Sequence, residues 1–277
     1  MGTQFHLFRL SLVVIPQRSM FAEGPEPNRQ EFLSEVFSTP RKFEHYGVDF
    51  YFQPDPTMSA PDGLLGRIGR QVVIGESMPP SEGFGDATHL GWKTCILAVD
   101  PGDHPDGQKA SIELNPVVGK PAGVMRSLVK SINESVLDPP YLIEVEPIVD
   151  AGDFWAFADE NVGEITNLTF EFIVPNGLWS ADTNIKEELR VAREKTGAQK
   201  VVTTFKSEEG INTNSDAVHE AVDYAVSGSG EIRARTRRGK RFNSANKPKS
   251  VKIDGAAITG SELMAAVANS IMRVLGR

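Results

Sequence analysis

Patterns of apolar and polar positions divide the chain into predicted strands and helices. An apolar run at residues 4–15, rich in Phe, Leu and Val and ending at Pro16, predicts a strand. In a later segment Leu168, Phe170 and Phe172 alternate with other residues, which puts their side chains on one face of a second strand. The strands expected from such patterns lie at 4–15, 47–53, 71–74, 92–100, 109–115, 141–149, 164–174 and 200–206.

Helical periodicity is clearest between residues 125 and 136. Apolar residues stand there at positions i, i+3, i+4, i+7 and i+11, so they form one stripe along a helix. Pro139 and Pro140 end this helix because proline cannot continue the hydrogen-bond ladder. Other helices are predicted at 29–37, 183–196 and 215–227, and after a capping box at 259–262.

The order of these elements predicts an α+β fold with mainly antiparallel sheets and with the helices concentrated in the C-terminal half. Residues 54–91 are dense in Gly, Pro, Ser and Asp, and we expect them to be loop-like and mobile apart from a short strand. We expect an N-terminal α+β region with long Gly/Pro-rich loops at 1–150 and a C-terminal α+β region at 151–277.

Composition is that of a globular protein, with 40% apolar and 24% charged residues and a net charge of −8. No apolar run reaches the roughly 20 residues of a membrane-spanning helix, so we expect no membrane insertion. Neither a secretory leader nor a myristoylation pattern is present, which makes the cytoplasm the expected location. The single cysteine, Cys95, lies in an apolar run, and we expect it to be a small buried hydrophobic residue rather than a nucleophile.

One strongly basic segment departs from the acidic balance of the chain. Residues 231–252 contain nine cations and one anion, Glu231, so their net charge is +8. The other 255 residues therefore have a net charge of −16, since the whole chain has a net charge of −8. Such separation of charge indicates a surface that binds an anionic partner.

The spacing within this segment predicts a two-stranded basic ribbon. Arg233, Arg235 and Arg237 alternate with uncharged residues, so their guanidinium groups are expected on one face of a strand. Gly239 favours a turn, after which residues 242–253 are expected to form the second strand. A ribbon with cations on one face and at its tip suits a polyphosphate, since each neutralised phosphate releases counterions. The predicted DNA contacts are Arg233, Arg235, Arg237, Arg238, Lys240 and Arg241, supported by Lys247, Lys249 and Lys252.

Three other interpretations of the sequence stay open. The cations could protect a solvated edge strand from aggregation, or the chain could be a scaffold whose ribbon binds an acidic protein. It could also be a metal-dependent nuclease, because Glu144 and Glu146 share one face of a predicted strand and carboxylate pairs bind Mg²⁺. The five histidines have no metal-binding spacing, and no nucleotide-binding fingerprint is present. The sequence therefore favours a binding protein without a cofactor over an enzyme.

The order of the later elements resembles a loose bacterial family. This order is similar to that of Rex-type phage-exclusion proteins and of the DNA-binding subunit of the Kiwa anti-phage system. It consists of a strand at 141–148, a strand ending in Val174-Pro175-Asn176, and then a helix, a strand, a helix, the basic ribbon and a final helix. The resemblance covers residues 90–277. It implies DNA binding in anti-phage defence by a homodimer, with a second defence-system subunit as a further partner. From the basic ribbon we expect this binding to be weakly sequence-specific.

Overall fold

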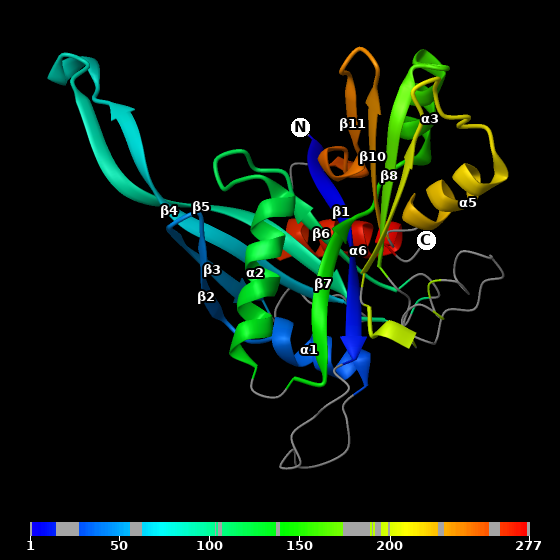
Figure 1. The fold of residues 1–277 in the computed structure, drawn as a ribbon. Coiled ribbons are helices and arrows are strands. Elements are labelled where there is room, and N and C mark those ends of the chain that lie inside the picture. The colour runs from blue at the N-terminus through cyan, green and yellow to red at the C-terminus, as the bar shows by residue number, and fades with distance from the viewer. Residues whose placement is uncertain are drawn as a thin grey trace.

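The computed structural model describes most of the 277 residues and combines two antiparallel sheets with helices (Figure 1). The described residues are 2–14, 28–55, 63–102, 104, 107–136, 139–173, 189, 191, 195–198, 200–226, 230–254 and 261–275. The predicted α+β class is confirmed. The helices are not concentrated in the C-terminal half, however, because two of the five α-helices in the described ranges, α1 (Arg29–Phe37) and α2 (Pro121–Ser135), lie before residue 138.

The larger sheet has eight strands in the order β12-β1-β6-β5-β4-β3-β2, with β7 also paired to β1. Its first strand is long enough to pair with β12 through residues 2–6 and with β7 through residues 8–14. The strands are β1 (Gly2–Val14), β2 (Arg41–His45), β3 (Val48–Pro54), β4 (Leu64–Ser77), β5 (Asp86–Asp100), β6 (Gln108–Glu113), β7 (Tyr141–Pro147) and β12 (Ser250–Asp254).

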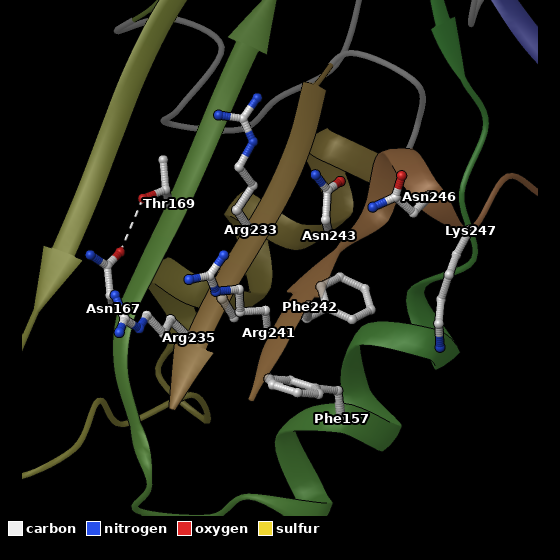
Figure 2. Close-up of a pocket in the computed structure, with 11 residues that line it drawn as sticks. Phe157, Asn167, Thr169, Arg233, Arg235, Arg241, Phe242, Asn243, Asn246 and Lys247 are labelled. Carbon is white, nitrogen blue, oxygen red and sulfur yellow. Dashed lines mark hydrogen bonds between the residues drawn. The ribbon is translucent and has the colours of Figure 1, made fainter. Parts of the chain in front are cut away.

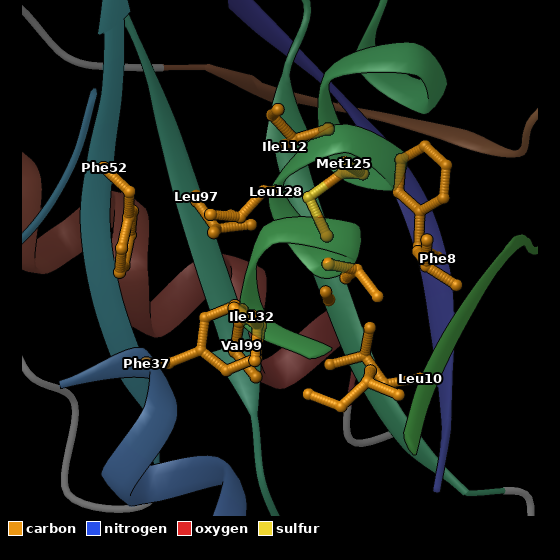
Figure 3. Packing of buried hydrophobic residues seen from close by; sticks show 14 of the residues in the cluster. Phe8, Leu10, Phe37, Phe52, Leu97, Val99, Ile112, Met125, Leu128 and Ile132 are labelled. Atoms are coloured by element: carbon orange, nitrogen blue, oxygen red, sulfur yellow. The ribbon is translucent and has the colours of Figure 1, made fainter. Parts of the chain in front are cut away.

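Helices cover both faces of the larger sheet. One face packs against α1 (Arg29–Phe37) and α2 (Pro121–Ser135), and the other packs against α6 (Ser261–Leu275). The predicted stripe of α2 is buried through Met125, Leu128 and Ile132, which lie among phenylalanines of the sheet (Figure 3). The helical periodicity of the sequence therefore correctly identified α2 as a helix that packs on this core.

The smaller sheet has four strands in the order β11-β10-β8-β9 and carries the basic segment. Its buried face packs against α3 and α5 through a separate apolar cluster. The elements are α3 (Ala151–Glu160), β8 (Ile165–Ile173), β9 (Lys200–Lys206), α5 (Asp216–Tyr224), β10 (Gly230–Thr236) and β11 (Arg241–Asn243). After β11 the chain returns to the larger sheet through β12 and α6.

Residues 64–91 are not a loop, and this prediction was wrong. They form most of a long hairpin of β4 and β5, whose register runs from Leu64 opposite Val99 to Ser77 opposite Asp86. Several of the glycines that suggested a loop, among them Gly66 and Gly91, stand where neighbouring side chains leave no room. A Cβ on Gly66 would lie 2.4 Å from Phe52 Cε2. Glycine thus allows close packing inside a strand here rather than a turn.

Other predicted elements have mixed outcomes. The strands and helices at 29–37, 141–149, 164–174, 200–206 and 215–227 are confirmed to within a few residues. The sequence analysis missed β2 and α3. Most of the helix predicted at 183–196, the Val174-Pro175-Asn176 patch and the first residues of the capping box at 259–262 lie outside the described residues.

Candidate nucleic-acid interface

The basic segment begins as a short hairpin on the exposed face of the smaller sheet. In β10 the side chains of Ile232, Ala234 and Thr236 are buried, while Arg233 and Arg235 are exposed. The predicted alternation is therefore confirmed for the strand. Gly239, with φ +84°, forms the turn that leads into β11.

Strand register places three cations in one row across this sheet. Arg235 of β10 lies opposite Arg241 of β11 on one side and opposite Asn167 of β8 on the other. Asn167 in turn lies opposite Lys206 of β9. Arg235, Arg241 and Lys206 are exposed, and none forms an ion pair with a carboxylate of the described residues. Within the part of the chain that the structure describes, the row therefore presents its positive charge to solvent without a carboxylate partner.

The adjacent arginine of β10 is neutralised by the protein itself. Arg233 donates from Nε and Nη2 to the two carboxylate oxygens of Glu231, each at 2.7 Å, and its Nη2 lies 3.4 Å from Glu171. The hydrogen bond to Glu231 raises the pKa of Arg233. Burial acts to raise the pKa of Glu231, but the hydrogen bond and charge of Arg233 outweigh it, and the pKa is lowered.

Most of the other predicted contact residues are also exposed, but several have partners in the chain. Arg238 lies 3.6 Å from Glu164, and Lys247 lies 3.3 Å from Asp153. The guanidinium group of Arg237 donates to the backbone carbonyl oxygen of Glu208. Lys240 is exposed next to the turn. These residues surround the hairpin without forming one continuous face.

The predicted second strand of the ribbon is wrong in its length. β11 has three residues, and a 3₁₀ turn at Ser244–Asn246 then directs the chain away from β10. Lys252 lies on β12, opposite Gln4 of β1 in the larger sheet, and Lys249 directly precedes that strand. Backbone pairing with β1 therefore separates the last two cations from the hairpin.

A groove of about 670 Å³ opens over the hairpin beside the row of cations (Figure 2). Arg235 and Arg241 project to the same side, and Phe157 of α3 lies at the free edge of β11, 5.5 Å from Phe242 between ring centroids. Among the described residues, the lining combines guanidinium, amide and aromatic groups and includes no carboxylate. It consists of Phe157, Asn167, Thr169, Arg233, Ala234, Arg235, Arg241, Phe242, Asn243, Asn246 and Lys247.

Sequence reasoning missed the contribution of the neighbouring strands to this site. Lys206, Asn167 and Thr169 join it only because β8 and β9 pair in one particular register. The strand predicted at 200–206 includes Lys206, but the local sequence did not indicate which cations would be its neighbours.

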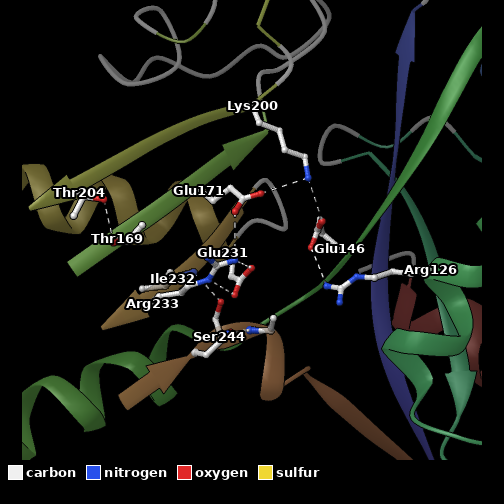
Figure 4. A network of polar contacts seen from close by, with 12 residues as sticks. Arg126, Glu146, Thr169, Glu171, Lys200, Thr204, Glu231, Ile232, Arg233 and Ser244 are labelled. Carbon is white, nitrogen blue, oxygen red and sulfur yellow. Dashed lines mark hydrogen bonds and ion pairs between the residues drawn. The ribbon is translucent and has the colours of Figure 1, made fainter. Parts of the chain in front are cut away.

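The paired carboxylates proposed for a nuclease lie in a different setting. Glu146 Oε2 is 3.6 Å from Arg126 Nη2, and its Oε1 is 3.9 Å from Lys200 Nζ (Figure 4). Burial raises the pKa of both Glu144 and Glu146, while the two cations oppose this at Glu146. Within the described part of the chain no three His, Cys, Asp or Glu side chains are grouped to hold a metal ion.

Cys95 is buried, as expected, with 2% of its surface exposed. Burial, with the charge of Glu113, raises its pKa to about 12. The thiol is therefore almost fully protonated near neutral pH, which disfavours a role as a nucleophile.

No protein-family model matches the chain, and no curated protein matches it. The resemblance to phage-exclusion and Kiwa proteins therefore stays a prediction. None of the helices in the described ranges is long and apolar enough to cross a membrane.

Proposed function

We propose that this protein binds DNA through the exposed face of the smaller sheet, with Arg235 and Arg241 as its central contacts. The proposal depends on one observation: two guanidinium groups occupy directly opposite positions of β10 and β11, with no ion-pairing carboxylate among the described residues. Like charges at such positions destabilise a sheet. A bound anion removes that cost, and arginine forms bidentate hydrogen bonds with phosphate oxygens.

Charge separation confines the contact to this face. A chain whose other residues are strongly acidic repels a polyanion from most of its surface, so a nucleic acid approaches along the cationic row. Contacts from arginine and lysine to phosphates carry little sequence information. Binding is therefore weakly sequence-specific and strongly dependent on salt.

The biological setting of the proposal comes from the resemblance alone. It suggests anti-phage defence by a homodimer that senses phage DNA without cutting it, with a second subunit as a further partner. The proposed cytoplasmic location comes instead from the absence of a targeting pattern in the sequence.

The test compares two double charge reversals of equal size. Arg235→Glu/Arg241→Glu removes the central contacts, whereas Lys130→Glu/Arg273→Glu changes two exposed cations on α2 and α6. Fluorescence anisotropy with labelled duplex and single-stranded DNA over a salt series measures affinity. We expect the first variant to bind at least roughly tenfold more weakly and its salt slope to shrink by about two, since each phosphate contact contributes about 0.9.

Two results would contradict the proposal. One is equal affinity of the wild type and the Arg235/Arg241 variant for DNA. The other is capture of an acidic protein by the wild type, lost in this variant, with no retention of DNA at low salt, which would assign the face to a protein partner instead.

A further inference from the structure

The hairpin of β4 and β5 extends beyond the larger sheet as an arm (Figure 1). β3 pairs with β4 only as far as Arg70, and β6 pairs with β5 only as far as Leu97. Beyond these positions the described strand pairs of the arm join β4 and β5 to each other alone. A two-stranded ribbon without further packing is marginally stable in water, so an arm of this length is expected to pack against something.

One face of the arm carries a continuous apolar stripe. Val73 and Leu90 are directly opposite each other and are 70% and 64% exposed. In the next row of the same face Trp92 is 54% exposed, and its ring lies 5.4 Å from that of Tyr51, which is 40% exposed. Contiguous exposed apolar groups of this kind mark a protein-binding surface.

The stripe lies on the face of the larger sheet that α6 covers, but beyond the part of that face which the helix reaches. Leu65, Ile96 and Ala98 on the same side of β4 and β5 pack against α6. Side chains alternate along a strand, so residues 65, 67, 69, 71 and 73 share this side. The arm therefore presents the uncovered end of a face whose other end is part of an apolar core.

Charges at the two ends of the stripe make it complementary to itself. Arg67 is exposed at the end near the body, and Asp86 is exposed at the tip on the same face, opposite Ser77. The two ends are ten residues of β4 apart, or roughly 33 Å. The midpoint falls between the row of Trp92 and the row of Leu90.

When two arms pack face to face, related by a twofold axis that passes through this midpoint perpendicular to the strands, each row of one arm faces a row of the other that lies equally far on the opposite side of the midpoint. The row of Arg67 then faces the row of the partner's Asp86 at both ends of the contact, and the two charges lie diagonally across it, within reach of a long side chain. Trp92 faces the row of the partner's Leu90. Gly69 faces the partner's Gly75 on β4, while Thr94 and Thr88, which lie opposite these glycines on β5, face each other across the contact.

We propose that the apolar faces of two β4–β5 arms pack antiparallel across a twofold axis, so that a second copy of this chain is the occupant of the surface. The contact is isologous, and each of its interactions occurs twice. An arm face roughly 33 Å long and roughly 10 Å wide is smaller than the roughly 800 Å² per partner of a standard interface, so we expect a weak dimer that dissociates at micromolar concentration. The arm shares no residue with the cationic face, so this inference does not depend on the proposed DNA binding.

Sedimentation velocity of the full chain from about 1 to about 100 µM tests the dimer. We expect a concentration-dependent shift from monomer to dimer, and at least a roughly tenfold higher dissociation constant for Leu90→Arg. The matched control is Val162→Arg, at a site that is 76% exposed outside the arm. Circular dichroism checks that both variants fold.

A charge exchange tests the register of the two arms. Arg67→Asp and Asp86→Arg each place like charges at both ends and weaken the dimer, whereas the double variant restores opposite charges and recovers the wild-type dissociation constant. A wild-type monomer at every concentration, or a dimer unaffected by Leu90→Arg, would overturn the proposal. So would a double variant weaker than both single variants. Binding of a different protein to the arm of a monomeric chain would assign the surface to that partner.

Discussion

Arg233 and Arg235 have the same position in the alternation of β10, but their surroundings give them different roles. Glu231 and Glu171 neutralise Arg233, whereas Arg235 faces another arginine. A bidentate arginine–carboxylate pair holds the guanidinium plane in a fixed orientation. We interpret Arg233 as a residue that stabilises the hairpin and Arg235 as one that is free to bind an external anion.

Substitution Glu231→Gln is expected to change stability and DNA affinity in opposite directions. Loss of the charged partner lowers the unfolding free energy by about 1 kcal/mol, reduced by the partial exposure of the pair. Release of Arg233 towards the groove increases affinity for DNA roughly threefold. Urea unfolding and fluorescence anisotropy measure the two effects, with Glu134→Gln on α2 as the control.

The stability effect of Glu231→Gln also depends on pH. The pKa of Glu231 is below its ordinary value of 4.5, so its contribution is present above that value and disappears as the pH falls through the lowered pKa. The difference in unfolding free energy between wild type and variant should therefore vanish in acid. DNA affinity unchanged by the substitution would contradict the prediction that Arg233, once released from Glu231, reaches DNA bound in the groove.

At the scale of elements, the β4–β5 hairpin shows why glycine content alone is a poor guide to loops. Gly66 lies where a Cβ would be 2.4 Å from the Phe52 ring and 2.9 Å from the Gln53 carbonyl oxygen. At Gly75, further along the same strand, a Cβ would have no neighbouring atom within 4 Å. Glycine is thus required for packing at one site and dispensable at the other.

This contrast predicts different effects of two alanine substitutions in one strand. Gly66→Ala is expected to destabilise the protein by about 1 to 3 kcal/mol, because the Phe52 ring and the neighbouring backbone must shift. Gly75→Ala should change the unfolding free energy by less than about 0.5 kcal/mol. Urea denaturation of both variants measures the effect, and equal stability of the two would contradict the packing described for β4 against β3.

The elements themselves were largely predictable from local patterns. The stripe of α2 and the alternation of β10 each depend on residues close together in the sequence, and both were identified. The path after β11 was not, because continuous extended residues do not reveal which partner strand they will join. Backbone pairing between β12 and β1, more than 200 residues apart, decides it.

Across the whole molecule, a chain of charges joins the two sheets. Glu146 lies on β7 of the larger sheet, and Arg126 lies on α2, which packs against that sheet. Lys200 and Glu171 lie on β9 and β8 of the smaller sheet (Figure 4). Burial raises the pKa of Glu146 despite both cations. Its ionised form is therefore less favourable in the folded protein than in the unfolded chain.

Substitution Glu146→Gln is expected to change the dependence of stability on pH. A carboxyl whose folded pKa is raised stabilises the fold when protonated, and this contribution is lost as the pH rises from about 4.5 through the raised pKa. The variant should therefore gain unfolding free energy relative to wild type as the pH rises from about 4.5 through the raised pKa of Glu146. Urea unfolding at several pH values measures it, and Glu160→Gln, which is exposed on α3, serves as the control. A difference that is constant with pH would contradict the raised pKa.

The sequence by itself determined the α+β class, the periodicity of the principal helix, the exposed cations of β10 and the acidic character of the remaining chain. These properties depend on composition or on residues within a few positions of each other. Tertiary structure decided that Arg241 and Lys206 align with Arg235, that Arg233 is neutralised, and that a glycine-rich segment becomes an arm. The physical reason is strand register, because a shift of one residue moves a side chain to the opposite face of the sheet, and only long-range packing selects among the registers.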